Sequence, residues 1–307
     1  MTDARTFHAK IDLDQPTPLP QTDRHPTAAH HWSKSERDAV TLALACGRPL
    51  LVRGEAGSGK SQLARAVAAE MKTELLEEII HARFEATDIL YRIDTLKRLA
   101  DAESQHDIQD WTPYIEPGPY WQACTAGKTK QCRVVLLIDE IDKADSDVPN
   151  ALLDVLANRS FTVPHTREVV RAEPDFHPLV MFTTNEDREL PAAFVRRCVV
   201  LNQNPPDQGK NPATFLAWLL ARGRAHSYCR VAENTRVAAA EMVLEDRKAA
   251  LEAGYPPVGL AEYVDLLRAL EDLAPGDTAA QEDWLKQLRG YALIKNRDQD
   301  QQRHAAP

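Results

Sequence analysis

Residues 49–61 read PLLVRGEAGSGKS, and this stretch decides the fold. Pro49–Val52 is a short apolar run typical of a buried strand. Gly54–Ser61 matches the pattern G-x-x-x-x-G-K-[ST], and Ser61–Met71 then repeats apolar residues on one helical face. A strand, a glycine-rich turn and a helix in this order predict a phosphate-binding loop. The alternative is a purely structural glycine-rich turn that joins the strand to the helix.

This Walker A motif assigns a role to each of its residues. Glycine lets the backbone wrap closely, so its N–H groups can face phosphate oxygens, and the helix N-terminus adds a favourable dipole. We expect Lys60 to reach the β- and γ-phosphates of ATP and the Ser61 hydroxyl to bind Mg²⁺. The predicted nucleotide-binding residues are Gly54, Glu55, Ala56, Gly57, Ser58, Gly59, Lys60 and Ser61.

A second motif lies 79 positions further on, where residues 134–140 read VVLLIDE. Five consecutive apolar residues suit a strand that is covered on both faces of a parallel sheet. Asp139, at the end of this Walker B strand, is expected to hold Mg²⁺ directly or through water. Glu140 is expected to polarise the attacking water. A charged strand end without a catalytic role is the alternative.

Two later segments complete the candidate site. Residues 181–185 read MFTTN, and the amide of Asn185 would lie beside the γ-phosphate, unless Asn185 simply starts a loop. Residues 190–198 read LPAAFVRRC, a short helix that ends in Arg196 and Arg197. Arginine suits planar, bidentate recognition of phosphate, including across a subunit boundary. An ordinary surface arginine pair in ion pairs with nearby acids is the alternative.

Alternation of strands and helices predicts an α/β fold with a parallel sheet. Further strands are expected at Leu75–Ile80, Leu179–Phe182 and Val199–Leu201, and strand patterns stop after Pro206. We therefore predict three segments: a disordered, proline-dotted tail at 1–33, an αβα ATP-binding domain at 34–205, and an all-helical lid at 206–307 with a frayed end. Nucleotide is expected between the last two.

Composition narrows the class of protein. The 307 residues carry a formal net charge of −9, which disfavours a nucleic-acid partner. Five scattered cysteines without a CxxC pair disfavour a disulfide framework and favour a reducing cytoplasm. No apolar run is long enough to cross a membrane, and the N-terminus lacks the apolar region of a signal peptide. Histidines at 25, 30 and 31 are expected to be solvated side chains of the tail.

The four motifs in this order resemble the AAA+ superfamily. The longer strings VVLLIDEIDKADSDVPNALLDVL and SFTVPHTREVVRAEPDFHPLVMFTTNEDRELPAAFVRRC are similar to the MoxR family, and the likeness covers roughly residues 34–270. It implies Walker A at Lys60 and Ser61, Walker B at Asp139 and Glu140, sensor 1 at Asn185, and an arginine finger at Arg197 or, second, Arg196. It also implies a homo-oligomeric ring, a hexamer by analogy, that remodels a protein complex with a von Willebrand factor A partner.

The resemblance also directs attention to three other stretches. Ser160–Val163 and Glu168–Arg171 are expected to pair as a hairpin. Residues 111–121 correspond to an insert that faces the pore, so Tyr120 or Trp121 is either a substrate contact or, as for most aromatic clusters, part of the core. At the expected position of sensor 2, residues 255–263 read YPPVGLAEY and lack a basic residue, while Arg268 lies two turns further on.

Three functions remain open at this point. An ATPase that works in a ring fits all four motifs. A nucleotide-loaded switch or scaffold with little turnover is the second possibility, although the intact Glu140 argues against it. A DNA-dependent motor or loader is disfavoured by the acidic balance and by the lack of a DNA-binding motif.

Overall fold

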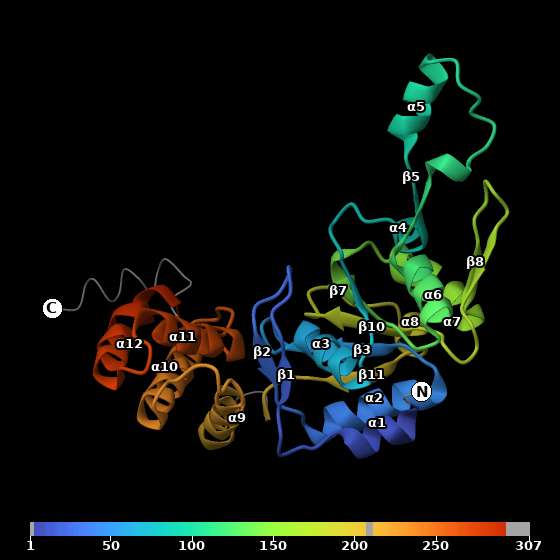
Figure 1. Cartoon of the computed structure of the whole chain (residues 1–307). Helices are drawn as coiled ribbons and strands as arrows, with labels where there is room; N and C mark the ends of the chain where they lie inside the picture. The colour runs from blue at the N-terminus through green and yellow to red at the C-terminus, as the bar shows by residue number, and fades with distance from the viewer. Residues whose placement is uncertain (1–2, 207–210, 293–307) are drawn as a thin grey trace. The chain divides into compact units, whose positions relative to one another are not determined.

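The computed structural model describes residues 3–206 and 211–292, and these form two compact units (Figure 1). Within the described residues, the first unit takes 3–13, 32–54 and 60–202, and the second takes 14–31, 55–59, 203–206 and 211–292. The centre of the Walker A loop, residues 55–59, therefore groups with the second unit, which differs from the predicted division at 205.

A five-stranded sheet forms the centre of the first unit. Its strand order is β11 (Val199–Asn202), β3 (Leu50–Arg53), β10 (Leu179–Thr184), β7 (Val135–Asp139) and β4 (Leu75–Ile79). Every neighbouring pair is parallel. The predicted parallel α/β fold is confirmed, and each of the five expected strands is present. Since all five strands run the same way, their carboxyl ends meet at one edge of the sheet, where ligands bind in open α/β folds.

Helices cover both faces of this sheet. α2 (Lys34–Cys46) and α3 (Lys60–Met71) contact one face, whereas α6 (Pro119–Lys130) and α7 (Asp147–Asn158) join a buried cluster on the other. The inner strands are mostly apolar because both faces of the sheet are covered, and all six residues of β10 are buried. The edge strand β4 is only partly buried and contains two glutamates. α2 begins at a capping box in which the Ser33 hydroxyl accepts from the Glu36 N–H at 3.2 Å.

The N-terminal segment differs from the predicted disordered tail. Residues 4–10 form α1 (Ala4–Lys10), whose Phe7 is fully buried and meets Trp32 edge to face at 5.9 Å between ring centroids. Lys10 also forms an ion pair with Glu70 of α3 at 2.9 Å. The sequence hides this order because a few apolar side chains, spaced far apart, fix the segment to α2 and α3, and neither periodicity nor composition records such contacts.

Two extensions project from the α/β core of the first unit. In one, an antiparallel ribbon carries a helix that lies well away from the sheet in Figure 1. The other is the expected hairpin, which is confirmed. Trp111 joins the two: its ring lies 4.1 Å from His165 of the hairpin loop, with the Arg98 guanidinium 3.7 Å above it. The elements are α4 (Ala86–Leu90), β5 (Tyr91–Ile93), α5 (Thr95–Glu103), η1 (Thr112–Tyr114), β6 (Ile115–Pro117), β8 (Ser160–Thr162) and β9 (Val169–Arg171).

The second unit is mainly helical and has its own core. β1 (Thr17–Leu19) pairs antiparallel with β2 (Ala28–His30). The helices of its described residues are α9 (Pro212–Ala225), α10 (Glu233–Glu252), α11 (Leu260–Leu273) and α12 (Thr278–Ala292). One face of α11 is apolar and buried, and it includes Tyr263 and Leu267. Residues 293–307, predicted to fray, lie outside the described part. None of the described helices is long and apolar enough to cross a membrane.

Candidate functional site

The predicted Walker A residues form a tight loop between β3 and α3. Gly57 and Gly59 take φ values of +74° and +95°, a region that L side chains rarely adopt, so both positions require glycine. Lys60 is the first residue of α3. Left-handed glycine conformations of this kind are found in loops that bind phosphate through their backbone N–H groups.

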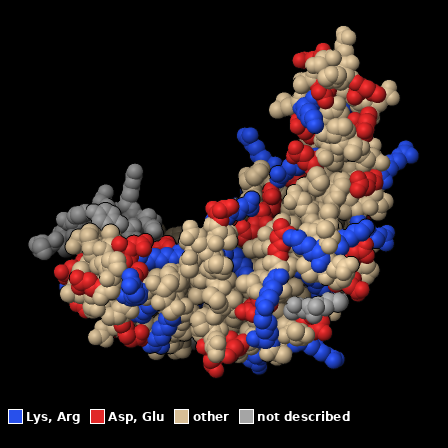
Figure 2. All heavy atoms as spheres, viewed as in Figure 1, with Lys and Arg blue, Asp and Glu red and all other residues tan. Residues whose placement is uncertain are grey.

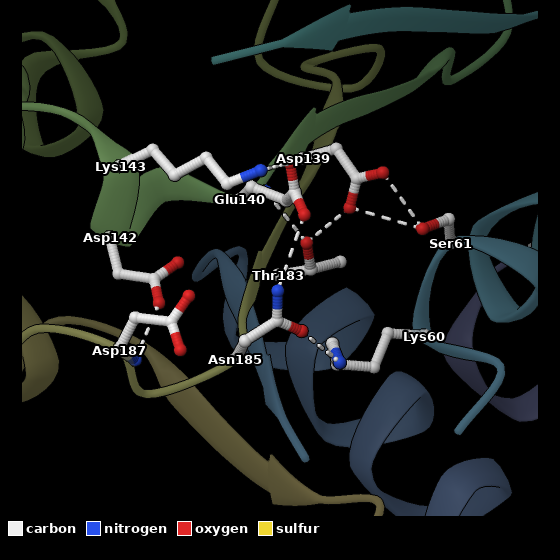
Figure 3. A network of polar contacts seen from close by, with 9 residues as sticks. All are labelled: Lys60, Ser61, Asp139, Glu140, Asp142, Lys143, Thr183, Asn185 and Asp187. Carbon is white, nitrogen blue, oxygen red and sulfur yellow. Dashed lines mark hydrogen bonds and ion pairs between the residues drawn. The ribbon is translucent and has the colours of Figure 1, made fainter. Parts of the chain in front are cut away.

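Lys60 is the buried cation of this site (Figure 3). Its ammonium donates to the Gly54 carbonyl at 2.8 Å and to the Asn185 side-chain oxygen at 2.7 Å. Burial lowers the pKa of Lys60 from its usual value, against the opposing effect of four carboxylates, the first of which is Asp139. A cation withheld from water in this way interacts strongly with a phosphate that replaces water.

Ser61 and Asp139, the two predicted metal ligands, lie in contact. The Ser61 hydroxyl contacts both carboxylate oxygens of Asp139, at 3.0 and 2.8 Å. A hydroxyl beside a carboxylate fits Mg²⁺, which takes few protein oxygens and completes its shell with water and substrate phosphates. Within residues 3–206 and 211–292, no cluster of three or more His, Cys, Asp or Glu side chains forms a metal site without such help.

Glu140 directly follows β7 and has a strained backbone. Its φ of 60° and ψ of 48° lie in the left-handed region, which is uncommon for a residue with a long side chain and is concentrated at functional sites. One carboxylate oxygen accepts from the Asn185 side-chain NH₂ at 3.2 Å, and the other forms an ion pair with Lys143. The conformation turns the side chain toward Asn185 rather than onward along the strand (Figure 3).

Thr183 is a site residue that the sequence reasoning missed. Its hydroxyl accepts from the Glu140 N–H at 2.9 Å and donates to the Asp139 carboxylate, and the residue is fully buried. It therefore ties β10 to both Walker B residues. The available signal was its position, because Thr183 and Thr184 are the two polar residues at the end of the otherwise apolar strand β10.

Asp142 and Asp187 form a further link between the Walker B and sensor 1 segments. The Asp187 N–H donates to the Asp142 carboxylate at 2.9 Å, and Asp142 is only 2% exposed. This contact joins the loop after β7 to the loop after β10, so Glu140 and Asn185 lie on segments that are held together on both sides of the site (Figure 3).

Arg196 and Arg197 lie apart from this cluster. Both follow α8 (Ala192–Val195) and are exposed. Arg197 donates to the Ala193 carbonyl at 3.1 Å, one turn back along its own chain. In the described part of the protein, neither arginine bonds to Lys60, Glu140 or Asn185. Arg196 lines a cleft of about 580 Å³ with Arg53, Thr184, Glu186, Arg188, Glu189, Leu190, Ala192 and Val195.

The contacts of the aromatic stretch and of Arg268 show where these remaining candidates lie. Tyr120 is 3% exposed and packs near Phe161 together with Trp121, so this part of the aromatic stretch belongs to the core. Arg268 bonds to the Tyr228 hydroxyl and the Thr27 carbonyl, at 3.1 and 3.0 Å, and lies 3.8 Å from Asp265. These partners belong to the second unit and include no residue of the nucleotide loop.

Comparison with known proteins shows what this chain is similar to. Residues 49–198 match the family model described as "AAA domain (dynein-related subfamily)". Midasin from Dictyostelium discoideum is 28% identical over 141 residues, which are 45% of this chain but 2% of midasin. The chain therefore spans a very small part of that relative.

Solved structures of RuvB from Thermotoga maritima are also similar. One RuvB mutant has a TM-score of 0.49 at 14% identity, with 84% of this chain and 71% of that chain covered. The structure titled RuvB Holliday junction branch migration motor has a TM-score of 0.46 at 17% identity, with 84% and 68% covered.

Proposed function

We propose that this protein, whose residues 49–198 match the AAA domain of the dynein-related subfamily, binds ATP with Mg²⁺ and hydrolyses it to ADP and phosphate. One observation carries the proposal: Asn185 bridges Lys60 to Glu140, with its amide oxygen on the ammonium and its NH₂ on the carboxylate. A purely structural loop needs no amide that joins a buried cation to an acid on a strained backbone.

The side chains of the cluster divide the work of hydrolysis. Lys60 and the loop N–H groups hold the β- and γ-phosphates. The Glu140 carboxylate accepts a hydrogen bond from the attacking water and polarises it toward the γ-phosphorus. Asn185 lies between cation and base and orients that water. Thr183 fixes the backbone of Glu140, so the base keeps its direction.

Ser61 and Asp139 would hold Mg²⁺ in this site. The ion, when bound, neutralises charge on the β- and γ-phosphates. The contribution of the chain is the pair of oxygens already in contact, together with the Thr183 hydroxyl, which donates to Asp139 and leaves the carboxylate of Asp139 oriented toward Ser61.

Hydrolysis in a ring is the finer part of the proposal. Arg196 and Arg197 are exposed and make no carboxylate ion pair in the described residues. Either guanidinium is therefore available to contact the nucleotide of a neighbouring subunit. On the MoxR likeness the ring is a hexamer that remodels or matures a protein complex, with a von Willebrand factor A partner. The sequence strings quoted above support that role.

Two other functions are less well supported. A nucleotide-loaded switch would not need the strained Glu140 aimed at Asn185. A DNA motor would need a basic surface, but on the face drawn in Figure 2 acidic and basic side chains are mixed, and the net charge is −9. A gel-shift assay at two salt concentrations would separate this last function from the others.

Calorimetry and phosphate release test the proposal directly. Wild-type protein should bind ATP with Mg²⁺ and release phosphate. Lys60→Ala should abolish binding, because the phosphates lose the buried ammonium. Asn185→Ala should bind ATP nearly as well but release phosphate much more slowly. Wild-type protein that binds no nucleotide, or a Lys60→Ala variant with unchanged affinity, would reject the assignment.

A further inference from the structure

The centre of the nucleotide loop needs an external support. Residues 55–59 contain two glycines with positive φ, and glycine has more conformational freedom than any other residue. A loop that binds phosphate through its N–H groups must nevertheless have one shape before the ligand arrives, or binding would have to supply the ordering free energy. The structure shows which residues of the second unit supply that shape.

Polar contacts hold the loop backbone at both ends. The Asn204 side-chain oxygen accepts from the Glu55 N–H at 2.9 Å, and the Gln203 side-chain NH₂ donates to the Ser58 carbonyl at 3.4 Å. Between them the chain passes close to α11: a Cβ added at Gly57 would lie 2.7 Å from the Cβ of Ala261. These contacts are neutral, and they leave the Glu55 side chain to be accounted for.

Arg247 of α10 binds that side chain. Its two terminal nitrogens donate to the two Glu55 carboxylate oxygens at 2.9 and 2.7 Å, a bidentate pair. The Arg247 side chain is 2% exposed, while that of Glu55 is 32% exposed. Arg247 also donates to the Val258 carbonyl at 3.0 Å, and its guanidinium lies 4.8 Å from the centre of the Phe215 ring.

The surroundings of Arg247 fix its direction. Phe215 and Val258 are buried members of the second unit's core, so the guanidinium is held by groups that cannot move without repacking. A buried arginine that only stabilised the fold could form its ion pair with any nearby carboxylate, and it would not need one in a phosphate-binding loop. The choice of Glu55 as partner places a charged, directional contact on the second residue of the Walker A motif.

We infer that Arg247 is a positioning residue for the nucleotide loop, which it holds through Glu55 so that the loop N–H groups are set before ATP binds. The inference rests on the proposed ATPase function. It also bears on the missing basic residue at 255–263: a lid cation does act on the nucleotide loop, but it comes from α10 and acts through a carboxylate rather than on phosphate.

Steady-state kinetics and loop exchange test this role. Glu55→Gln and Arg247→Met should each raise the KM for ATP about tenfold or more, since each removes a charge-assisted bidentate contact. The kcat should stay near that of wild type, because Lys60, Glu140 and Asn185 are untouched. The double variant should match the single variants, as the second change removes nothing further. Arg247→Lys, with one contact retained, should fall between.

Arg236 provides the matched control. It lies on the same helix, is 7% exposed, and donates to carbonyls of its own unit, including that of Val231 at 3.1 Å, with no contact to the loop. Arg236→Met should lower the thermal midpoint and leave the KM unchanged. An equal rise in KM for Arg236→Met, or unchanged KM for both Arg247→Met and Glu55→Gln, would overturn the inference.

A measurement without nucleotide separates this inference from the proposed function. Amide hydrogen exchange of peptides covering residues 55–61 should be faster in ligand-free Glu55→Gln than in ligand-free wild type, and unchanged in Arg236→Met. Equal exchange in Glu55→Gln and wild type would overturn the positioning role even if ATP is hydrolysed. Failure of wild type to hydrolyse ATP would instead reject the proposed function.

Discussion

At the scale of single residues, Glu140 and its neighbour Asp139 have different surroundings and should fail differently. Glu140→Gln keeps the shape and the Asn185 contact but cannot polarise water well, so turnover should fall by about 10²-fold or more while ATP and Mg²⁺ still bind. Asp139→Asn should instead weaken binding and its dependence on Mg²⁺. The measurements are phosphate release and calorimetry with and without Mg²⁺. Wild-type turnover in Glu140→Gln would place the base elsewhere.

Thr183 offers a second test at this scale. Thr183→Val preserves the volume but removes both the hydroxyl that orients Asp139 and the acceptor for the Glu140 N–H. Leaving a buried group unpaired costs about 1–3 kcal/mol, so both stability and turnover should fall. Thr184→Val is the control: its hydroxyl accepts from the Glu186 N–H at 2.9 Å and touches neither Walker B residue. Equal turnover in the two variants would show that Thr183 does not position the Walker B residues.

At the scale of elements, sequence patterns located the sheet well. Each predicted strand is present, and the inner strands gave the clearest patterns because parallel strands covered on both faces are mostly apolar. Each motif follows the strand that it was expected to follow. Asn185 is next to Glu140 because β10 and β7 are neighbours, a consequence of strand order that one sequence does not reveal. Arg247 had no local signal: a buried arginine in a helix is recognised only when its distant partner Glu55 is known.

The N-terminal helix gives a prediction at this scale. Phe7→Ala should remove about 3–5 kcal/mol of folding free energy, since Phe7 is fully buried against Trp32. His8→Ala should change it by less than about 1 kcal/mol, because the pair that His8 forms with Asp38 at 3.3 Å is exposed. The midpoint of urea unfolding, followed by tryptophan fluorescence, reports both. A Phe7→Ala variant as stable as wild type would contradict the packing of α1 and support the disordered tail predicted from the sequence.

At the scale of the whole molecule, the proposed ring makes the active site a property of two subunits. Arg196 and Arg197 have no part in the Lys60–Asn185–Glu140 cluster of their own chain, so we expect the finger to serve the neighbour. An arginine finger supplied in trans is worth about 10³–10⁵ in rate. Activity per subunit should therefore rise with protein concentration, and ATP should promote assembly, because a ligand that binds the assembled state better favours it by mass action.

Mixing two inactive variants tests this arrangement. Arg197→Ala should bind ATP but not hydrolyse it, and Lys60→Ala should lose its own site while still offering an intact finger. When one is titrated into the other, activity should reappear at interfaces where an intact nucleotide loop meets an intact arginine finger. Light scattering follows the assembly. Arg196→Ala mixed in the same way decides which arginine acts. A fully active wild-type monomer, or co-assembled mixtures that stay inactive with both arginine variants, would rule out a finger supplied by the neighbouring subunit.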